Sequence, residues 1–228
     1  MTTPFRASDA ADYDERIRSM VPGYDLLHEL TGAFIIANAP PSSRILLAGV
    51  GTGNELIPLA EKRSDLSFTA LDSSAEMLAV AEAKASAAGI SAQVEFVHAR
   101  VEDFTPTNSY DVVVSHLVSH FYPDDGSRKK FFETLSSGLR TGGSLLISEF
   151  GIALNSSSRS TYGEWLVERK TDHPSRILTR VESEFHTLSR ERFEEILRDC
   201  DLAEVETFFT ALGVRAVHAI RVSGTDSR

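Results

Sequence analysis

Three glycines at every second position, Gly49, Gly51 and Gly53, could bring a ligand close to the backbone of this 228-residue chain. Glycine has no Cβ atom, so the backbone can adopt positive φ angles there and a ligand can approach it closely. The glycines follow the short apolar segment Arg44–Ala48 and precede a helical pattern that starts at Asn54. Open parallel sheets bind cofactors at such turns between a strand and a helix. We therefore expect the cofactor of an enzyme at this turn.

A carboxylate, Asp72, stands 19 residues after Gly53, at the end of a second apolar segment. A carboxylate at that position can accept hydrogen bonds from the hydroxyls of a ribose. Asp72 thus indicates an adenosine ribose and does not by itself indicate a reaction. A second role, in which its charge stabilises the N-terminus of the next helix, is compatible with ribose binding.

The spacing of the glycines argues against a loop that binds phosphate. The dinucleotide fingerprint G-x-G-x-x-G would need glycine at position 54, where the chain has Asn54. A phosphate loop would need lysine followed by serine or threonine after its last glycine, and the chain lacks this pair. An oxidoreductase is therefore the weakest of the enzyme classes considered.

The loop Gly49-x-Gly51-x-Gly53 resembles motif I of the class I S-adenosylmethionine-dependent methyltransferases. Four further segments are similar to later motifs of that family: Leu71–Leu78, Val94–Phe104, Tyr110–Phe121 and Leu139–Ile147. The resemblance extends from about Arg16 to Arg221. It implies an α/β fold with a Rossmann-like, seven-stranded and mostly parallel sheet, an antiparallel C-terminal strand, and helices on both faces. It also implies S-adenosyl-L-methionine as the cofactor and S-adenosyl-L-homocysteine as the product.

The same resemblance implies a cofactor site built from several segments of the chain. Its expected residues are Tyr24, Gly49, Gly51, Gly53, Asp72, Ser73, Met77, Val101, Glu102, Ser115 and His116. Tyr24 would lie near the methionyl end of the cofactor, and Met77 would lie against the adenine. Arg100 stands where the family usually has an acid that accepts the adenine amino group, and arginine cannot accept a hydrogen bond. We therefore expect the adenine contact from Glu102, from the backbone near Val101, or from a water molecule.

Two histidines, His116 and His120, could supply a base for methyl transfer. Both follow the predicted fourth strand, and histidine titrates near neutral pH. Methyl transfer is a displacement on an activated sulfonium, so the protein mainly orients the reactants and removes a proton when the acceptor carries one. The alternative for His120 is that it only packs and forms hydrogen bonds.

The segment 151–188 lies where the family places its substrate cover. It contains Tyr162, Trp165, Arg169, His173, Arg176, Arg180 and His186. We expect Trp165, Arg176 and Arg180 to contact the substrate, because arginine can bind a carboxylate through two parallel hydrogen bonds. The alternative is that these arginines are exposed charges on a lid helix.

Strand and helix patterns alternate along the chain. The expected strands are Arg44–Ala48, Phe68–Leu71, Val94–Val97, Tyr110–Ser115, Ser144–Ser148, Ala203–Ala211 and Val214–Arg221, the last two joined by Leu212-Gly213 in an antiparallel hairpin. The expected helices are two within Glu15–Ala39, then Asn54–Arg63, Ser74–Ala88, one that carries Phe131 to Leu139 and ends at Thr141–Gly143, and one with Phe193, Ile196, Leu197 and Cys200 on one face. Ser73 and Glu76 have the spacing of a capping box. Such alternation predicts a parallel sheet covered by helices on both faces.

Length and composition predict one globular domain. We expect a single domain over residues 1–228, with an N-terminal helical cap over 1–40 and the substrate cover over 151–188. The formal net charge of −10 disfavours a general nucleic-acid binder. One cysteine cannot form a disulfide within the chain, and the seven histidines show no ligand spacing, so no metal is expected. The sequence shows no signal-peptide pattern and no apolar segment of membrane-spanning length, so we expect a cytoplasmic protein without a membrane partner.

The sequence leaves three functions open, and in two of them the chain binds S-adenosylmethionine itself. A methyltransferase that acts on a small molecule predicts an aromatic, partly apolar pocket under Trp165. A non-catalytic S-adenosylmethionine-binding protein predicts an intact glycine loop without a free path to the methyl group. The sequence decides neither the methyl acceptor nor the oligomeric state, for which a homodimer is one option.

The third function is that of a carboxy-S-adenosylmethionine synthase of tRNA wobble-uridine modification. The segment Arg18–Tyr24 resembles those enzymes, whereas the loop Ala48–Gly53 departs from theirs. This function predicts a positively charged site near Tyr24 and Arg176 or Arg180, because the cofactor would carry an additional carboxylate.

Overall fold

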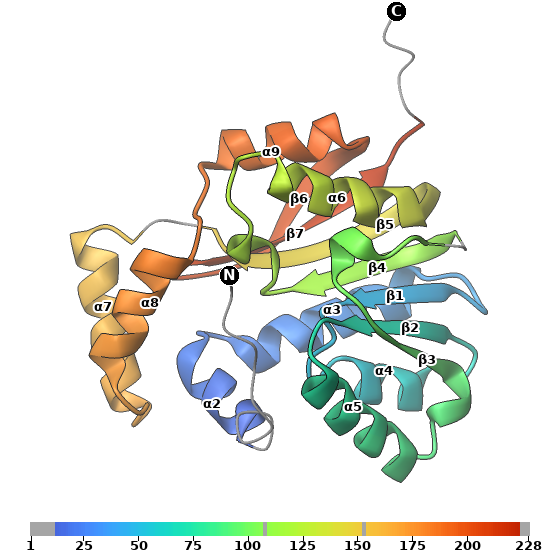
Figure 1. The fold of residues 1–228 in the computed structure, drawn as a ribbon, viewed down its shortest axis with the longest axis horizontal. Helices are drawn as coiled ribbons and strands as arrows, with labels where there is room; N and C mark the ends of the chain where they lie inside the picture. Colours follow the sequence, from blue (N-terminus) through green and yellow to red (C-terminus); the bar gives the residue numbers. More distant parts are fainter. Residues whose placement is uncertain (1–11, 107–108, 152–153, 224–228) are drawn as a thin grey trace, which may run out of the picture.

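A seven-stranded sheet forms the centre of the protein. The computed structural model describes residues 12–106, 109–151 and 154–223 (Figure 1). The strands follow the order β3-β2-β1-β4-β5-β7-β6. Their bounds are β1 Arg44–Ala48, β2 Ser67–Asp72, β3 Val94–His98, β4 Tyr110–His116, β5 Leu139–Phe150, β6 Leu202–Ala211 and β7 Val214–Arg221. Neighbours from β3 to β5 pair in parallel, and β7 pairs antiparallel with both β5 and β6, which confirms the predicted fold.

Helices cover both faces of this sheet. The α-helices are α2 Tyr13–Met20, α3 Tyr24–Asn38, α4 Leu56–Lys62, α5 Ala75–Ala87, α6 Ser127–Gly138, α7 Ser156–Glu168, α8 Pro174–Glu184 and α9 Arg190–Asp199. Short 3-10 turns are η1 Ser91–Gln93, η2 Val101–Asp103 and η3 Ser119–Phe121. In Figure 1, α6 and α9 lie on one face of the sheet, and α3, α4 and α5 lie on the other.

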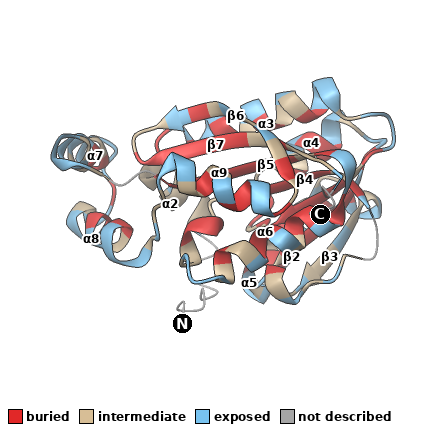
Figure 2. Ribbon diagram, turned by 90° about the horizontal axis from the view of Figure 1, so that it is seen from above, coloured by how far each residue is buried: buried red, intermediate tan, exposed pale blue. Residues whose placement is uncertain are grey.

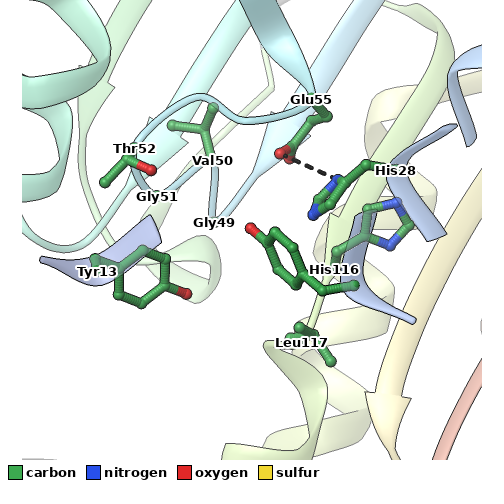
Figure 3. A pocket seen from close by; sticks show the side chains of 10 residues that line it. Tyr13, His28, Gly49, Val50, Gly51, Thr52, Glu55, His116 and Leu117 are labelled. Carbon is green, nitrogen blue, oxygen red and sulfur yellow. Dashed lines mark ion pairs between the residues drawn. The ribbon is translucent and has the colours of Figure 1, made fainter. Parts of the chain in front are cut away.

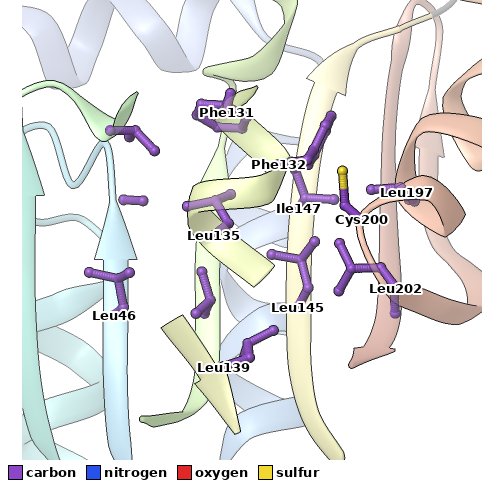
Figure 4. Close-up of a cluster of buried hydrophobic side chains, with 14 of the residues drawn as sticks. Leu46, Phe131, Phe132, Leu135, Leu139, Leu145, Ile147, Leu197, Cys200 and Leu202 are labelled. Atoms are coloured by element: carbon purple, nitrogen blue, oxygen red, sulfur yellow. The ribbon is translucent and has the colours of Figure 1, made fainter. Parts of the chain in front are cut away.

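Alternating side chains of the central strands fill two apolar layers. Successive residues of a strand point to opposite faces, so Leu46 packs toward α6 and α9 while Ile45 and Leu47 pack toward α3, α4 and α5. Figure 4 shows the first layer, which includes Phe131, Phe132, Leu135, Leu145, Ile147, Leu197, Cys200 and Leu202. The buried runs in β1 and β4 are therefore apolar at consecutive positions, as expected of strands covered on both faces. Figure 2 shows that the middle strands are mostly buried.

Strand β5 is longer than predicted, and helix α6 is shorter. The predicted helix end at Thr141–Gly143 is wrong, because α6 ends at Gly138 and β5 starts at Leu139. Leu139 pairs with Tyr110, and the register shifts before the next pair. The positive φ of 76° at Gly142 therefore serves an irregularity of the strand and not a helix cap.

The N-cap of α5 is Ser74 and not Ser73 as predicted. The Ser74 hydroxyl accepts a hydrogen bond from the Met77 amide at 3.2 Å and donates one to Glu76 at 2.9 Å. The Ser74 amide itself donates to Asp72 at 2.9 Å. Ser74 itself has an extended backbone, so the helix starts at Ala75.

Helices α7 and α8 stand beside the sheet and pack on the N-terminal helices (Figure 1). The Tyr162 hydroxyl donates to the Met20 carbonyl at 2.7 Å, and the Thr171 hydroxyl donates to the Ser19 carbonyl at 2.8 Å. These bonds use carbonyls at the end of α2 that have no partner within the helix. The described part of the predicted N-terminal cap and the predicted substrate cover therefore contact each other directly.

Candidate functional site

A small cavity lies at the carboxyl edge of the sheet, below the glycine-rich loop (Figure 3). Its volume is about 30 Å³. The lining comes from the two N-terminal helices, the loop with the turn after it, and the end of β4: Tyr13, Tyr24, His28, Gly49, Val50, Gly51, Thr52, Glu55, His116 and Leu117. The structure thus brings Tyr24, Gly49, Gly51 and His116 of the predicted cofactor site to one place.

The glycine loop has the backbone conformation that its sequence requires. Gly49, Gly51 and Gly53 have φ angles of 82°, 55° and 81°, which disfavour other residues. A Cβ atom at Gly49 would overlap the Val118 side chain, whereas one at Gly51 would meet no atom within 4 Å. Position 49 is therefore glycine for packing, and position 51 presents bare backbone to open space.

Asp72 holds this loop in place. Its carboxylate accepts hydrogen bonds from the Gly51 amide at 2.8 Å and from the Ser74 amide at 2.9 Å. Burial raises the pKa of Asp72, although these backbone bonds act in the opposite direction. Each carboxylate oxygen has a second lone pair, so Asp72 retains acceptors for ribose hydroxyls.

A histidine and a glutamate that the sequence analysis did not select face each other across the cavity. His28 Nδ1 lies 3.6 Å from Glu55 Oε2 (Figure 3). Neither ring nitrogen of His28 has a hydrogen-bond partner among the described residues. Burial raises the pKa of Glu55 to about 7 and lowers that of His28 to about 4. The position of Glu55, two residues after Gly53, could have identified it, whereas His28 carries no signal in the sequence.

His116 is buried at the end of β4 with both ring nitrogens engaged. Its Nε2 lies 2.9 Å from the Thr31 hydroxyl and its Nδ1 lies 3.0 Å from the Ser148 hydroxyl. Burial lowers the pKa of His116 well below its usual value, so the ring is neutral at pH 7. The adjacent Ser115 donates from its hydroxyl to the Ala48 carbonyl at 2.7 Å and ties β4 to β1.

His120 lies outside the cavity, in an aromatic cluster. Its Nδ1 accepts the Phe150 amide at 3.3 Å, and its ring packs against Phe121, Phe150 and Phe185. Burial lowers the pKa of His120 to about 3. These contacts match the packing alternative, and a catalytic role for His120 stays a prediction.

Comparison with known proteins identifies the part of the chain that carries this site. The pattern of the methyltransferase domain family matches residues 45–143, which include the glycine loop, Asp72 and His116. This part of the chain is thus similar to methyltransferase domains. Curated relatives are carboxy-S-adenosyl-L-methionine synthases, at 28% identity over 145 residues in Campylobacter lari and 31% over 145 residues in Campylobacter jejuni subsp. doylei. Each match covers 64% of this chain and 60% of the relative.

Solved methyltransferases share the fold over most of the chain. A putative S-adenosyl-L-methionine-dependent methyltransferase from Methanococcus maripaludis has a TM-score of 0.69 at 20% identity and covers 99% of both chains. Magnesium protoporphyrin IX methyltransferase from Synechocystis, solved with bound S-adenosylhomocysteine, has a TM-score of 0.66 at 18% identity and covers 90% of this chain and 86% of its own.

The remaining predicted cofactor residues follow strands β2 and β3. Met77 and Val101 are buried. Glu102 accepts hydrogen bonds from Arg100 Nε at 2.6 Å and from the Tyr122 hydroxyl at 2.7 Å. The Ser73 carbonyl lies 3.1 Å from His98 Nε2. Arg100, which stands where the family usually has an acid, forms an ion pair with Glu102. Contacts of these residues with adenine stay predictions.

The predicted substrate residues do not line the cavity of the methyltransferase domain. Trp165 is half-buried, stacks on Tyr162 with ring centroids 6.0 Å apart, and lies under the Arg169 guanidinium. Arg176 is exposed, and Arg180 pairs with Glu184 at 2.8 Å. Their contact with a substrate stays a prediction.

Helix α2 closes the domain's glycine loop from the outside. Asp14 accepts hydrogen bonds from the Thr52 hydroxyl at 2.5 Å, from Asn54 at 2.9 Å and from Lys84 at 2.5 Å. Tyr13 of the same helix lines the small cavity beneath, so α2 forms part of the cavity wall.

The described residues indicate neither a metal site nor a membrane span. Within residues 12–106, 109–151 and 154–223, no cluster of three or more potential protein ligands could hold a metal ion. No helix in these ranges is long and apolar enough to cross a membrane.

Proposed function

We propose that this chain is an S-adenosylmethionine-dependent methyltransferase that methylates a small molecule and releases S-adenosyl-L-homocysteine. The observation that carries the proposal is the hydrogen bond of 2.8 Å from the Gly51 amide to Asp72. It joins a glycine loop of the methyltransferase domain to a carboxylate at the end of β2, at the sheet edge where such folds bind ligands.

The residues around the loop fit this cofactor. Asp72 has acceptors for the ribose hydroxyls, and the unpartnered nitrogens of His28 can bond to polar atoms of the methionyl part. Tyr24, whose hydroxyl accepts from Asn54 at 3.0 Å, lies beside them. When bound, the cofactor supplies an activated methyl group, and the chain's main task is to orient the acceptor toward it.

His116 is proposed as a residue of the cofactor and acceptor site. Because the ring is neutral and bonded on both sides, it could accept a proton only after one of its hydroxyl partners moves. Its position on the cavity wall favours a role in orientation over a role as a free base.

The synthase function is the second candidate, and the names of the curated relatives favour it. A carboxylated cofactor carries an additional negative charge and needs a cation nearby. The described residues that line the cavity include Glu55 and no lysine or arginine. Arg18, the arginine near Tyr24, pairs with Asp25 at 2.8 Å, and Arg180 pairs with Glu184. The electrostatics of the cavity therefore favour S-adenosylmethionine over its carboxylated form.

The test is transfer of an isotope-labelled methyl group. The protein is incubated with S-adenosylmethionine bearing a deuterated methyl group and a panel of small acceptors with O, N, S and C nucleophiles. We expect one acceptor class to gain the label in step with formation of S-adenosylhomocysteine. A cofactor that gains a carboxyl group instead would favour the synthase. Binding without turnover of any acceptor would favour a non-catalytic binding protein.

A variant at Asp72 connects this activity to the site. Asp72→Ala should weaken S-adenosylmethionine binding by about tenfold or more, because hydrogen bonds to a charged group are worth about 1.5–3 kcal/mol. Asp65→Ala is the matched control, since Asp65 is an exposed carboxylate in an ion pair with Arg63. Equal affinities of both variants, measured by calorimetry, would contradict the assignment of the site.

A further inference from the structure

Glu55 presents a carboxylate to the cavity without a bound cation. Its side chain is 10% exposed, and His28 Nδ1 lies 3.6 Å from its Oε2, beyond hydrogen-bond distance. Figure 3 shows the two side chains pointing toward each other beside the glycine loop. A buried carboxylate in this setting is costly to ionise unless a positive charge lies beside it.

The groups that face Glu55 from the surrounding elements do not offset the cost of its burial. They are Tyr13 on α2, Tyr24 and His28 on α3, Asp72 on β2 and Lys84 on α5. Lys84, the cation among them, donates its bond of 2.5 Å to Asp14. Burial therefore dominates and raises the pKa of Glu55 to about 7.

We propose that Glu55 binds the positively charged sulfonium of S-adenosylmethionine and makes the site discriminate this cofactor from S-adenosylhomocysteine. The inference rests on the proposed function and adds a specificity-determining residue to it. Gly51, whose amide bonds to Asp72, lines the same cavity as Glu55, so a cofactor with its ribose at Asp72 would bring its methionyl part, which carries the sulfonium, near Glu55. After transfer of the methyl group, the sulfur is a neutral thioether and the ion pair is lost. S-adenosylhomocysteine therefore binds more weakly than S-adenosylmethionine and is released.

Discrimination of this kind depends on pH with a defined sign. Below pH 7 the carboxyl of the free protein is mostly protonated, so the bound sulfonium must expel a proton. Above pH 7 the carboxylate is already ionised and binds the sulfonium at no such cost. The preference for S-adenosylmethionine over S-adenosylhomocysteine should therefore increase about tenfold between pH 6 and pH 8, which corresponds to about 1.4 kcal/mol.

The test measures Kd for both ligands by titration calorimetry at pH 6, 7 and 8. Both Kd values are first corrected for ionisation of the free ligand's amino group, because the sulfonium makes this group more acidic in S-adenosylmethionine than in S-adenosylhomocysteine. Wild-type protein should show the tenfold rise in preference, and Glu55→Gln should hold the ratio constant, at or below the wild-type value of pH 6. Glu61→Gln is the matched control, because Glu61 lies on the exposed side of the same helix, α4. It should behave as wild type.

Two further readouts do not depend on the variant. Calorimetry of the wild type in two buffers of different ionisation enthalpy should show proton release at pH 6.5 with S-adenosylmethionine and less with S-adenosylhomocysteine. Sinefungin, which carries an ammonium in place of the sulfonium, should follow S-adenosylmethionine.

The outcomes separate this inference from the proposed function. If both ligands tighten equally with pH, Glu55 contacts their common amino group and the inference is overturned while the proposed function stands. A constant ratio in the wild type also overturns it. If neither ligand binds the wild type at any of the three pH values, the proposed function itself fails.

Discussion

Burial determines the charge of the histidines around this site. The pKa of His28 is lowered to about 4 and that of His120 to about 3, and that of His116 is also well below its usual value. All three are therefore neutral at pH 7. The expectation of a histidine that titrates near neutral pH rested on its value in water, which the sequence alone cannot correct for burial.

Neutral burial of His120 makes the fold sensitive to acid. Below pH 6.5 the unfolded chain binds a proton at this residue and the folded chain does not, so stability is lost as pH falls from 6.5 toward 3. We expect the wild type to lose about 1 kcal/mol more unfolding free energy than His120→Asn between pH 7 and pH 5.5. Urea unfolding at both pH values measures this difference. Equal losses in the two proteins would refute the burial argument.

Single residues of the site were predictable where backbone conformation or a pairing rule required a residue type. Gly49, Gly51 and Asp72 met this condition, since a positive φ and a strand-end carboxylate leave a pattern in the sequence. His28 did not, because it reaches the cavity only through the packing of α3 against the loop. Glu55 was within reach of pattern reasoning and was missed.

At the scale of elements, α2 lies against the glycine loop, and we predict that it limits the entry of a cofactor. Asp14 connects it to Thr52 and Asn54 of the loop region and to Lys84 of α5. Asp14→Ala should raise the association rate of S-adenosylmethionine about fivefold, because a lost hydrogen bond contributes about 1 kcal/mol to the closed arrangement. Stopped-flow fluorescence measures the rate, with the exposed Glu15→Ala on the same helix as control. An unchanged rate in Asp14→Ala would show that α2 does not limit entry.

A buried charge network joins the sheet to α6 and to the chain before α9. Glu149 accepts Arg215 Nη2 at 2.7 Å and the Ser119 hydroxyl at 2.6 Å, and Arg128 Nη1 lies 3.6 Å away. Glu149 and Arg215 are directly opposite residues of the antiparallel pair β5 and β7. The network therefore depends on the antiparallel pairing of β7 with β5.

Loss of the carboxylate in this network should be strongly destabilising. Glu149→Gln leaves two buried guanidinium groups without compensation, and we expect it to cost about 3–5 kcal/mol of unfolding free energy. Glu182→Gln, which breaks an exposed pair with Arg159, should leave stability nearly unchanged. Urea denaturation of both variants measures the difference, and similar small effects would contradict the structural role of Glu149.

The bounds of helices and strands with a clear hydrophobic period were predictable to within a few residues. Bounds that depend on pairing with a distant strand were not. β1 and β7 have the predicted bounds. The start of β5 was wrong, because its first residues pair with Tyr110 through an irregular register that no local pattern indicates.

For the molecule as a whole, the observed fold agrees with the methyltransferase pattern found in the sequence. The activity is inferred from the proposed site. The strand order and the antiparallel β7 match the fold that the motifs imply, and the methyltransferase pattern covers residues 45–143. The chain spans about 60% of the length of its curated relatives, the synthases. The cavity lining, rather than those names, is what favours a methyltransferase here.

The most direct measurement is native mass spectrometry of freshly purified protein, with identification of any small molecule released. We expect bound S-adenosylmethionine or S-adenosylhomocysteine or, if the protein is purified without ligand, a higher Tm on addition of S-adenosylmethionine. A carboxylated cofactor would favour the synthase. No bound molecule together with an unchanged Tm would contradict the central claim that this loop binds S-adenosylmethionine.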